Sequence, residues 1–452
     1  SLLVSGNLGV DTKLVTGESG SAYSILASGN LDLRGDGSTV AADGLALGAK
    51  LSLTGASVNA DTNILLPSGD LSLTGDLNIN GNLLAEGSSQ VFNKLIRSAD
   101  AGDITLASLT GNVVVGANAK VSVSANGIGG NAGSLTVLAS QGSFNNSGTI
   151  DGRASLNQTS GAFHLDTGSL ADSGSSSFTG LNDMLDAGGF AHSRQFRVRN
   201  GNVTIDSNIT SRHFGLSVDS GDILVTGRIN ASGVTGGSIS LTARGNLTLA
   251  SGSILNASAE TFDSAGKGGS ILLEAGAQQN GSANLGAILD LQAGSTILLS
   301  VNDHVAGTWN TPGSSASEGK FTGTLHLRAP RTADNTDLGI ASIQGNILGA
   351  SSVIAEGFKV YQPADGVMNT TLRNQIHTDS TDFLGAAGTG NANETAMLAR
   401  LLSGAPDAAG LQSNLVLAPG VEIVNTSGDL TLGLANTSGS TNTEALAAAD
   451  WD

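Results

Sequence analysis

Residues 221–243 read GDILV (221–225), RINAS (228–232) and GSISLTA (237–243), and residues 245–275 repeat this order as GNLTL (245–249), ILNAS (254–258) and GSILLEA (269–275). In each run apolar residues alternate with polar or small ones, and Gly, Asn and Ser separate the runs. Such runs predict strands of about five residues. Repetition every few tens of residues is typical of a solenoid. We therefore predict repeats of three strands each.

A strand of this length has two or three inward side chains and cannot bury them alone. Stacked repeats lay Ile and Leu over Ile and Leu and close a continuous core. Gly and Asn suit the corners because they tolerate positive φ, and stacked Asn side chains can form a hydrogen-bond ladder. The predicted fold is all-β, a right-handed parallel β-helix with loop excursions and one short docked helix. The residues predicted to point inward are Ile223, Val225, Leu247, Leu249, Ile271 and Leu273.

The composition of the 452 residues agrees with a solenoid. Aromatic residues make up 3% and charged residues 13%, which a narrow core and a small polar surface would explain. The net charge of −18 argues against nucleic acid and anionic membranes as partners. Apolar runs of about five residues predict no membrane insertion. Cysteine is absent, so in a secreted chain the strand ladders would supply the stability.

Breaks in the pattern define the expected segments. We assign 1–171 and 200–301 to the β-helix, 172–199 to an excursion, 302–360 to a loop-rich interruption and coils, 361–413 to an extra-helical element, and 414–452 to further coils. Residues 181–186 suggest one helical turn. Residues 394–402 predict the one convincing helix, with Asn393 as its N-cap and Gly404 at its end. We expect Leu398, Leu401 and Leu402 to dock it on the side of the β-helix as a separable platform.

No group of residues converges on a catalytic, cofactor-binding or metal-binding site, so we predict no cofactor. Acidic residues stand mostly alone in Gly-Asp corners, where we expect each carboxylate to bond its own backbone; these are Asp70, Asp103, Asp222 and Asp429. The pairs Asp183 with Asp186 and Asp334 with Asp337 lack the ligand count of a calcium loop. The six histidines have no metal-binding spacing, and His326 is expected to face outward from a strand.

The interruptions hold the larger side chains that could anchor a partner. Trp, Arg and Tyr are the usual anchors of recognition. The possible binding surface therefore comprises Arg194, Arg197, Arg199, Trp309, Arg328, Arg331 and Tyr361. On a strand, residues 197 and 199 share a face. The alternative is that these loops pad the flank of the β-helix, and for any one loop we favour padding.

Repeated Ser-Gly-Asp-Leu and Gly-Asn-Leu-Thr-Leu units with Ile-Asn-Ala-Ser corners, in a chain without Cys, resemble the filamentous haemagglutinin-type large exoproteins of Gram-negative bacteria. The family's N-terminal secretion domain is not evident, and neither is a toxin module. The resemblance implies two-partner secretion through an outer-membrane transporter and an extracellular fibre used in attachment or biofilm formation.

We therefore expect a segment of a longer, secreted, non-enzymatic adhesin at the cell surface. Its partners would be a surface glycan, a protein receptor or copies of itself. The alternatives are a β-helical enzyme acting on polysaccharides and a self-assembling structural fibre.

Overall fold

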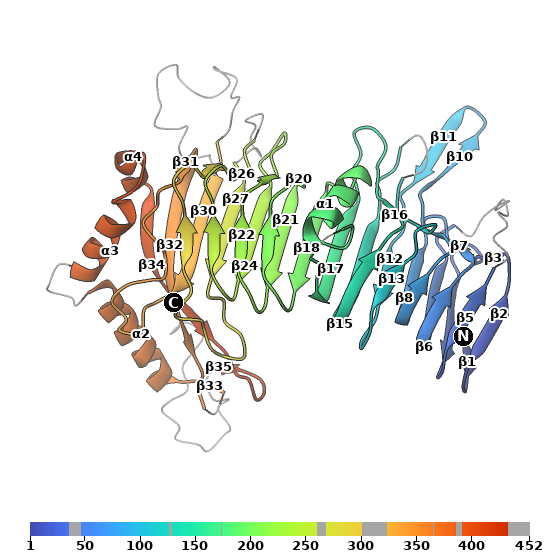
Figure 1. The fold of residues 1–452 in the computed structure, drawn as a ribbon, viewed down its shortest axis with the longest axis horizontal. Coiled ribbons are helices and arrows are strands. Elements are labelled where there is room, and N and C mark those ends of the chain that lie inside the picture. The colour runs from blue at the N-terminus through green and yellow to red at the C-terminus, as the bar shows by residue number, and fades with distance from the viewer. Residues whose placement is uncertain are drawn as a thin grey trace. The chain divides into compact units, whose positions relative to one another are not determined.

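The computed structural model describes residues 1–35, 47–125, 129–172, 174–259, 268–300, 323–364, 366–385 and 391–432. Strands account for 47% of the structure, and the sheets are parallel apart from one hairpin (Figure 1). The predicted all-β class is therefore confirmed. The chain divides into two compact units, Ser1–Ser217 with Gly227–Ala231 and Val218–Thr226 with Ser232–Asp452, and each is described by itself.

In the first unit, successive passes of the chain add one strand at a time to a long parallel ladder. This first ladder contains β1 (Leu2–Val4), β4 (Ala22–Ala27), β6 (Lys50–Ala60), β8 (Asp70–Ile79), β12 (Ile104–Ala107), β15 (Ser134–Asn146), β17 (Ala162–Ser169), β18 (Ser193–Val198) and β21 (His213–Val218). Because β18 pairs with β17 over six residues, the interruption expected at 172–199 ends before residue 193.

Two further ladders complete the first unit. One joins β2 (Leu8–Asp11), β5 (Leu31–Arg34) and β13 (Val113–Val115) to the C-terminal parts of β6, β8 and β15. The other contains β3 (Leu14–Val15), β7 (Asn63–Leu65), β9 (Leu83–Leu84), β14 (Lys120–Ser122) and β16 (Thr149–Asp151). The last pass contributes β19 (Val203–Ile205) and β20 (Asn208–Thr210), and β20 pairs with β23 (Arg228–Asn230).

The second unit repeats this arrangement. Its first ladder contains β24 (Ser238–Ala243), β27 (Ser270–Ala275), β30 (Gly323–Pro330), β32 (Ala350–Tyr361) and β34 (Leu415–Ile423). The other two contain β22 (Ile223–Val225), β25 (Leu247–Leu249) and β28 (Leu289–Leu291), and β26 (Ile254–Asn256), β29 (Thr296–Leu298) and β31 (Asn346–Leu348). A short pair, β33 (Val367–Met368) with β35 (Thr431–Leu432), follows.

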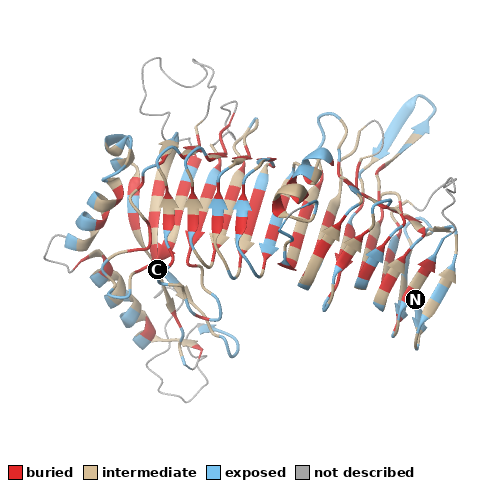
Figure 2. Ribbon diagram, in the orientation of Figure 1, coloured by how far each residue is buried: buried red, intermediate tan, exposed pale blue. Residues whose placement is uncertain are grey.

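The core consists of the alternate residues of these strands (Figure 2). Ile223 pairs with Leu247 and Ile239 with Ile271, so apolar side chains of consecutive passes lie over one another. All six residues predicted to point inward are at most 1% exposed, which confirms the register.

Corner residues link consecutive passes through their side chains. Asp222 Oδ1 accepts from the Asn246 backbone N–H at 2.7 Å, and Asn246 Oδ1 accepts from the Ile288 N–H at 2.9 Å. In the first unit Asp103 Oδ1 accepts from the Ser134 N–H at 2.8 Å. The expectation that the carboxylate bonds its own backbone is therefore wrong for Asp103, and Asp222 likewise bonds the backbone of the next pass. A carboxylate at such a corner accepts from a backbone N–H of the next pass.

The described chain contains four helices where the sequence predicted one and a single turn. In the first unit α1 (Phe178–Ala187) starts at Ser177, whose hydroxyl accepts from the Gly180 N–H, and it buries Phe178, Leu181, Asn182 and Leu185. The second unit has α2 (Thr370–Leu384), α3 (Ala392–Leu402) and α4 (Ala408–Gln412). Within the described residues, none of these helices is long and apolar enough to cross a bilayer.

The predicted helix at 394–402 exists as α3, with different details. It begins after Asn391, while the Asn393 amide donates to the Asp382 carbonyl at 2.9 Å. Its fully buried residues are Met397 and Leu401, whereas Leu398 and Leu402 are half-buried. The predicted N-cap is therefore wrong, because Asn393 lies inside the helix, and the C-cap is Ser403, one residue before Gly404. The predicted apolar face is partly right, because Leu401 is buried but Met397, rather than Leu398 or Leu402, is the other fully buried residue.

Candidate functional site

Three stacked strands bring charged residues together on the outward face of the second unit. Glu274 on β27 pairs in register with Arg328 on β30, and Arg328 with Glu356 on β32. Their chain neighbours Leu273, Leu327 and Ala355 are fully buried on the inward face. The ladder register therefore places an acid, a base and an acid side by side.

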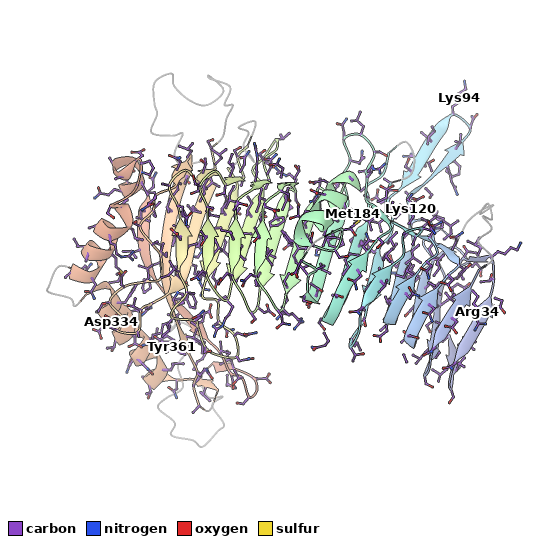
Figure 3. All side chains as sticks on the ribbon, in the orientation of Figure 1. Arg34, Lys94, Lys120, Met184, Asp334 and Tyr361 are labelled. Carbon is purple, nitrogen blue, oxygen red and sulfur yellow. The ribbon has the colours of Figure 1, made fainter. Side chains whose placement is uncertain are left out.

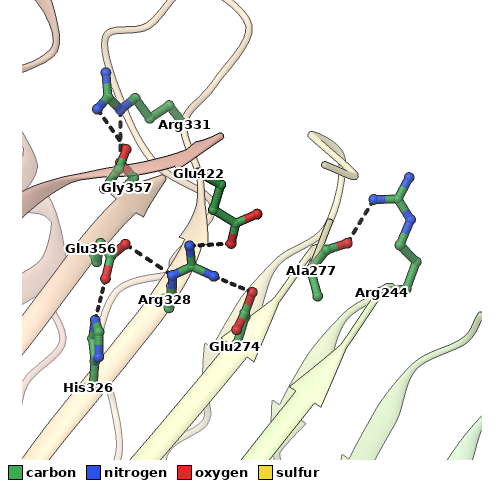
Figure 4. Close-up of polar contacts among 10 residues, drawn as sticks. Arg244, Glu274, Ala277, His326, Arg328, Arg331, Glu356, Gly357 and Glu422 are labelled. Atoms are coloured by element: carbon green, nitrogen blue, oxygen red, sulfur yellow. Dashed lines mark hydrogen bonds and ion pairs between the residues drawn. The ribbon is translucent and has the colours of Figure 1, made fainter. Parts of the chain in front are cut away.

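Arg328 is the centre of this arrangement (Figure 4). Its guanidinium lies 2.5 Å from Glu274 Oε1, 3.0 Å from Glu356 Oε1 and 2.5 Å from Glu422 Oε1, the last from β34. The guanidinium carbon also lies 4.1 Å from the centre of the Phe358 ring, close enough for a cation–π contact. The planar guanidinium of Arg328 thus pairs with three carboxylates and contacts one aromatic ring face. We call Glu274, His326, Arg328, Glu356 and Glu422 the Arg328 cluster.

The Arg328 cluster is largely withdrawn from water. The side chain of Arg328 is 13% exposed, and those of Glu274 and Glu422 are 10% and 21% exposed. Burial raises the pKa of Glu274, and the Arg328 charge offsets this only in part. Burial would also raise the pKa of Glu356, but the contact with His326, whose Nε2 lies 2.6 Å from Glu356 Oε2, and the Arg328 charge lower it overall.

Two carboxyl groups with pKa values displaced in opposite directions are the pattern of an acid and base pair. The sequence did not reveal this cluster because its three carboxylates lie 28, 54 and 94 residues from Arg328. Aligning the runs GSILLEA (269–275) and GTLHLRA (323–329) in register would have placed Glu274 and Arg328 in one column. His326 does face outward, as expected from the strand pattern, and is half-buried.

Arg331 and Tyr361 are buried and connect strands to α2. Arg331 is 2% exposed and donates to the carbonyls of Gly357 and Gly420 at 2.8 and 3.0 Å. Burial lowers its pKa. Tyr361 is 4% exposed, and its hydroxyl donates to Asp379 Oδ2 at 2.9 Å; burial and this carboxylate raise its pKa. Their assignment to an exposed surface is therefore wrong, because backbone carbonyls and Asp379 already use their polar groups.

The three arginines of the first unit do not form one patch either. Arg194 is fully buried, donates to the Phe190 carbonyl at 2.7 Å and pairs with Asp186 of α1. Burial lowers its pKa, and Asp186 opposes that shift. Arg197 and Arg199 share the outward face as predicted, and Arg199 binds both oxygens of Asp166 at 2.8 Å. A buried guanidinium cannot contact a partner, so Arg194 is removed from the predicted surface.

The remaining predicted residue, Trp309, lies outside the described residues. Of the seven predicted residues, the structure therefore leaves Arg197 on the surface, Arg199 and Arg328 partly accessible, and Arg194, Arg331 and Tyr361 buried.

The two acidic pairs considered for a divalent cation already have protein partners. Asp186 pairs with Arg194, and Asp337 with Arg400 at 2.6 Å. Asp334 accepts from the Thr332 hydroxyl at 2.6 Å. In the described part of the chain, no group of three or more His, Asp or Glu residues is arranged to hold a metal ion.

Shallow grooves lie on the surface of the second unit. One of about 420 Å³ runs between β31, β32 and α4 and is lined by Asn346, Leu348, Pro406 and Asn414 among others. Another of about 280 Å³ is lined by Arg331, Phe358 and Lys359. No carboxylate of the Arg328 cluster lines either groove. Neither groove therefore contains Glu274 or Glu356, the two carboxyl groups whose pKa values are shifted. No family model, curated protein or solved structure matches the chain.

Proposed function

We propose that each unit is a right-handed parallel β-helix. Three parallel ladders that each receive one strand per pass support this winding. Right-handedness follows from the strong preference of parallel crossover connections for that hand. Small-angle scattering and vibrational circular dichroism of the purified chain test the proposal, and a helix-dominated spectrum would reject it.

We further propose that the chain is a segment of a secreted surface adhesin, similar to the filamentous haemagglutinin-type exoproteins. The observation that carries this proposal is the internal pairing of the charged residues of the Arg328 cluster. Arg328 pairs with all three carboxylates inside the cluster, and no described groove presents them to a substrate. Such a surface suits many weak contacts along repeated strands better than chemistry at one point. The expected partners are a surface glycan, a protein receptor or copies of the chain, after export through an outer-membrane transporter.

The adhesin proposal is tested by attachment. Beads coated with the purified chain should adhere to bacterial or host cells more than beads coated with a β-rich protein of equal charge. Binding to a glycan array would then identify the receptor class. Beads that adhere no better than the control would reject the proposal.

One observation favours the enzymatic alternative, which is the opposite displacement of the pKa values of Glu274 and Glu356. A β-helical enzyme acting on acidic polysaccharides would use such a pair as acid and base. Release of reducing or unsaturated sugars by the parent chain, abolished in Glu356→Gln and retained in Glu86→Gln of the first unit, would establish this alternative and overturn the adhesin-only proposal.

A further inference from the structure

One hairpin of the first unit stands apart from the ladders. β10 (Ser88–Phe92) and β11 (Leu95–Ala99) pair antiparallel with each other in a separate two-stranded sheet (Figure 1). The hairpin is inserted in the chain between β9 and β12, which belong to two of the parallel ladders. It therefore extends from the corner between β9 and β12.

The tip of this hairpin is apolar on both faces. Phe92 pairs with Leu95 on one face and Val91 with Ile96 on the other. These four side chains are 56%, 52%, 69% and 42% exposed. Behind the tip the rungs become polar, with Gln90 opposite Arg97 and Ser89 opposite Ser98. The apolar character is thus confined to the last two rungs before the turn.

The charge of the hairpin is opposite to that of the whole chain. Residues 88–99 contain Lys94 and Arg97 and no acidic residue, whereas the chain carries −18. Both cations are exposed, and neither forms an ion pair with any residue that the structure describes. Lys94 occupies the turn at the end of the hairpin (Figure 3). The charge argument against anionic membranes therefore does not apply locally.

We propose that this hairpin docks the chain on an anionic lipid surface by inserting its tip into the interface. A protein partner with a flat surface would cover one face of the hairpin and leave the other pair of apolar residues in water. A lipid interface surrounds both faces at once. The two apolar rungs span about 7 Å at the rise of a strand, which matches the depth of about 5–10 Å that interfacial elements reach.

The positions of Lys94 and Arg97 also agree with a hairpin tip that is inserted in the lipid interface. Arg97 lies one rung behind the apolar residues, at the level expected for phosphate headgroups. Lys94 can extend its aliphatic stem along the apolar tip and return its ammonium to the headgroups. A single small element gives weak, reversible binding that depends on both apolar area and charge. This inference does not depend on the adhesin proposal.

The test uses the full chain and large unilamellar vesicles of either pure phosphatidylcholine or a mixture with phosphatidylglycerol. We expect co-flotation with the mixed vesicles and about fivefold weaker partitioning for each of Lys94→Gln and Arg97→Gln. The matched control is Arg34→Gln with Lys50→Gln, which removes the same two charges from exposed sites elsewhere. Phe92→Ser with Ile96→Ser should abolish binding, whereas Leu109→Ser with Leu156→Ser, at 72% and 89% exposure, should not.

Insertion is measured directly through a cysteine, because the chain has none of its own. An environment-sensitive dye on Phe92→Cys should shift to shorter wavelengths with mixed vesicles, and the same dye on Leu156→Cys should not. Unchanged melting temperatures of all variants would show that they fold. Equal partitioning of the hairpin and control variants would overturn the proposal. So would hairpin variants that change only the sedimentation of the chain itself, which would identify a second copy as the occupant.

Discussion

At the scale of single residues, the most unusual feature is the sharing of Arg328 by three carboxylates. Taking a guanidinium and several carboxylates out of water is costly, and their attraction repays the cost only with good geometry. The planar guanidinium of Arg328 provides that geometry, with three carboxylate oxygens at 2.5 to 3.0 Å. The cluster is consequently more sensitive to the loss of its cation than an exposed ion pair would be.

We predict that Arg328→Met lowers the stability by about 3–5 kcal/mol at pH 7, because three carboxylates remain partly buried without a counter-charge. Without the cation, which lowers the pKa of both Glu274 and Glu356, the folded-state pKa values of these two acids rise above their unfolded values. Their destabilising effect is then present at pH 7 and is lost as the pH falls toward about 4, where they become protonated. Chemical denaturation at both pH values measures this difference.

The control for this variant is Lys50→Met in the first unit, whose partner Asp70 lies 2.6 Å away in an exposed ion pair. An exposed pair contributes far less than a buried one, because water and salt screen it. A cost of Arg328→Met that is equally small, or independent of pH, would contradict the account of the cluster.

A second prediction tests the register of the ladders. Ile271 is 1% exposed and pairs with Ile239 and Leu325, so Ile271→Asp would bury an unpaired charge between two apolar neighbours. We expect a loss of about 4 kcal/mol or more. Ser270→Asp, one residue earlier and on the exposed face, should cost less than about 1 kcal/mol. Thermal melting compares the two, and similar melting temperatures would show that the register is wrong.

Alternation was sufficient to place the core, because inward residues such as Leu247 repeat every second position in every pass. The assignment of Arg194 to a binding surface was wrong, although the same alternation puts Arg194 on the buried face with Phe196. Arginine is rarely buried without partners, and its partners Asn182 and Asp186 come from α1. The extent of α1 was not evident from the sequence.

At the scale of elements, α2 and α3 occupy the chain between β32 and β34. Phe383 of α2 is fully buried, and a Cβ at Gly357 of β32 would collide with its ring. Met397 and Leu401 of α3 are buried as well, and the Ile343 N–H donates to the Leu401 carbonyl at 2.9 Å. These contacts argue against the separable platform expected from the sequence, because the helices share buried surface with the strands.

We therefore predict that Leu401→Ala costs about 2–5 kcal/mol, as is typical when a buried leucine leaves a cavity. Thr395→Ala on the exposed side of the same helix should be nearly neutral. Deletion of residues 379–406 with a Gly-Ser link should broaden the thermal transition of the chain. A deletion variant with the melting curve of the parent would restore the platform interpretation.

The helices were hard to predict for a physical reason. α2 has a suitable N-cap, since Asn369 accepts from the Leu372 N–H at 3.0 Å. Most of its 15 residues are polar or β-branched, and only Leu372 and Phe383 are buried. Without an apolar stripe, such a segment has no helical signature of its own. Its helix depends on contacts with β34 and with Arg331, which sequence periodicity cannot show.

At the scale of the whole molecule, the stability of each repeated pass depends on its contacts with the adjacent passes. A side chain in one pass contacts the passes before and after it, as Val113 does with Leu77 and Phe144. The chain has no cysteine, so no disulfide adds to these contacts. The stability of such an arrangement is approximately the sum of terms for each repeat and each interface.

The last prediction follows from this additivity. A fragment of residues 1–231 contains every ladder of the first unit and should fold by itself, because truncation removes only the contacts of its final pass. We expect a β-type circular dichroism spectrum and a cooperative melt, at a lower temperature than the same signal in the full chain. Val113 is fully buried, so the same fragment with Val113→Asp should lose the transition, which would show that the signal comes from the ladders. A fragment that lacks a cooperative transition would mean that the passes depend on distant parts of the chain, and nearest-neighbour stacking would then be rejected.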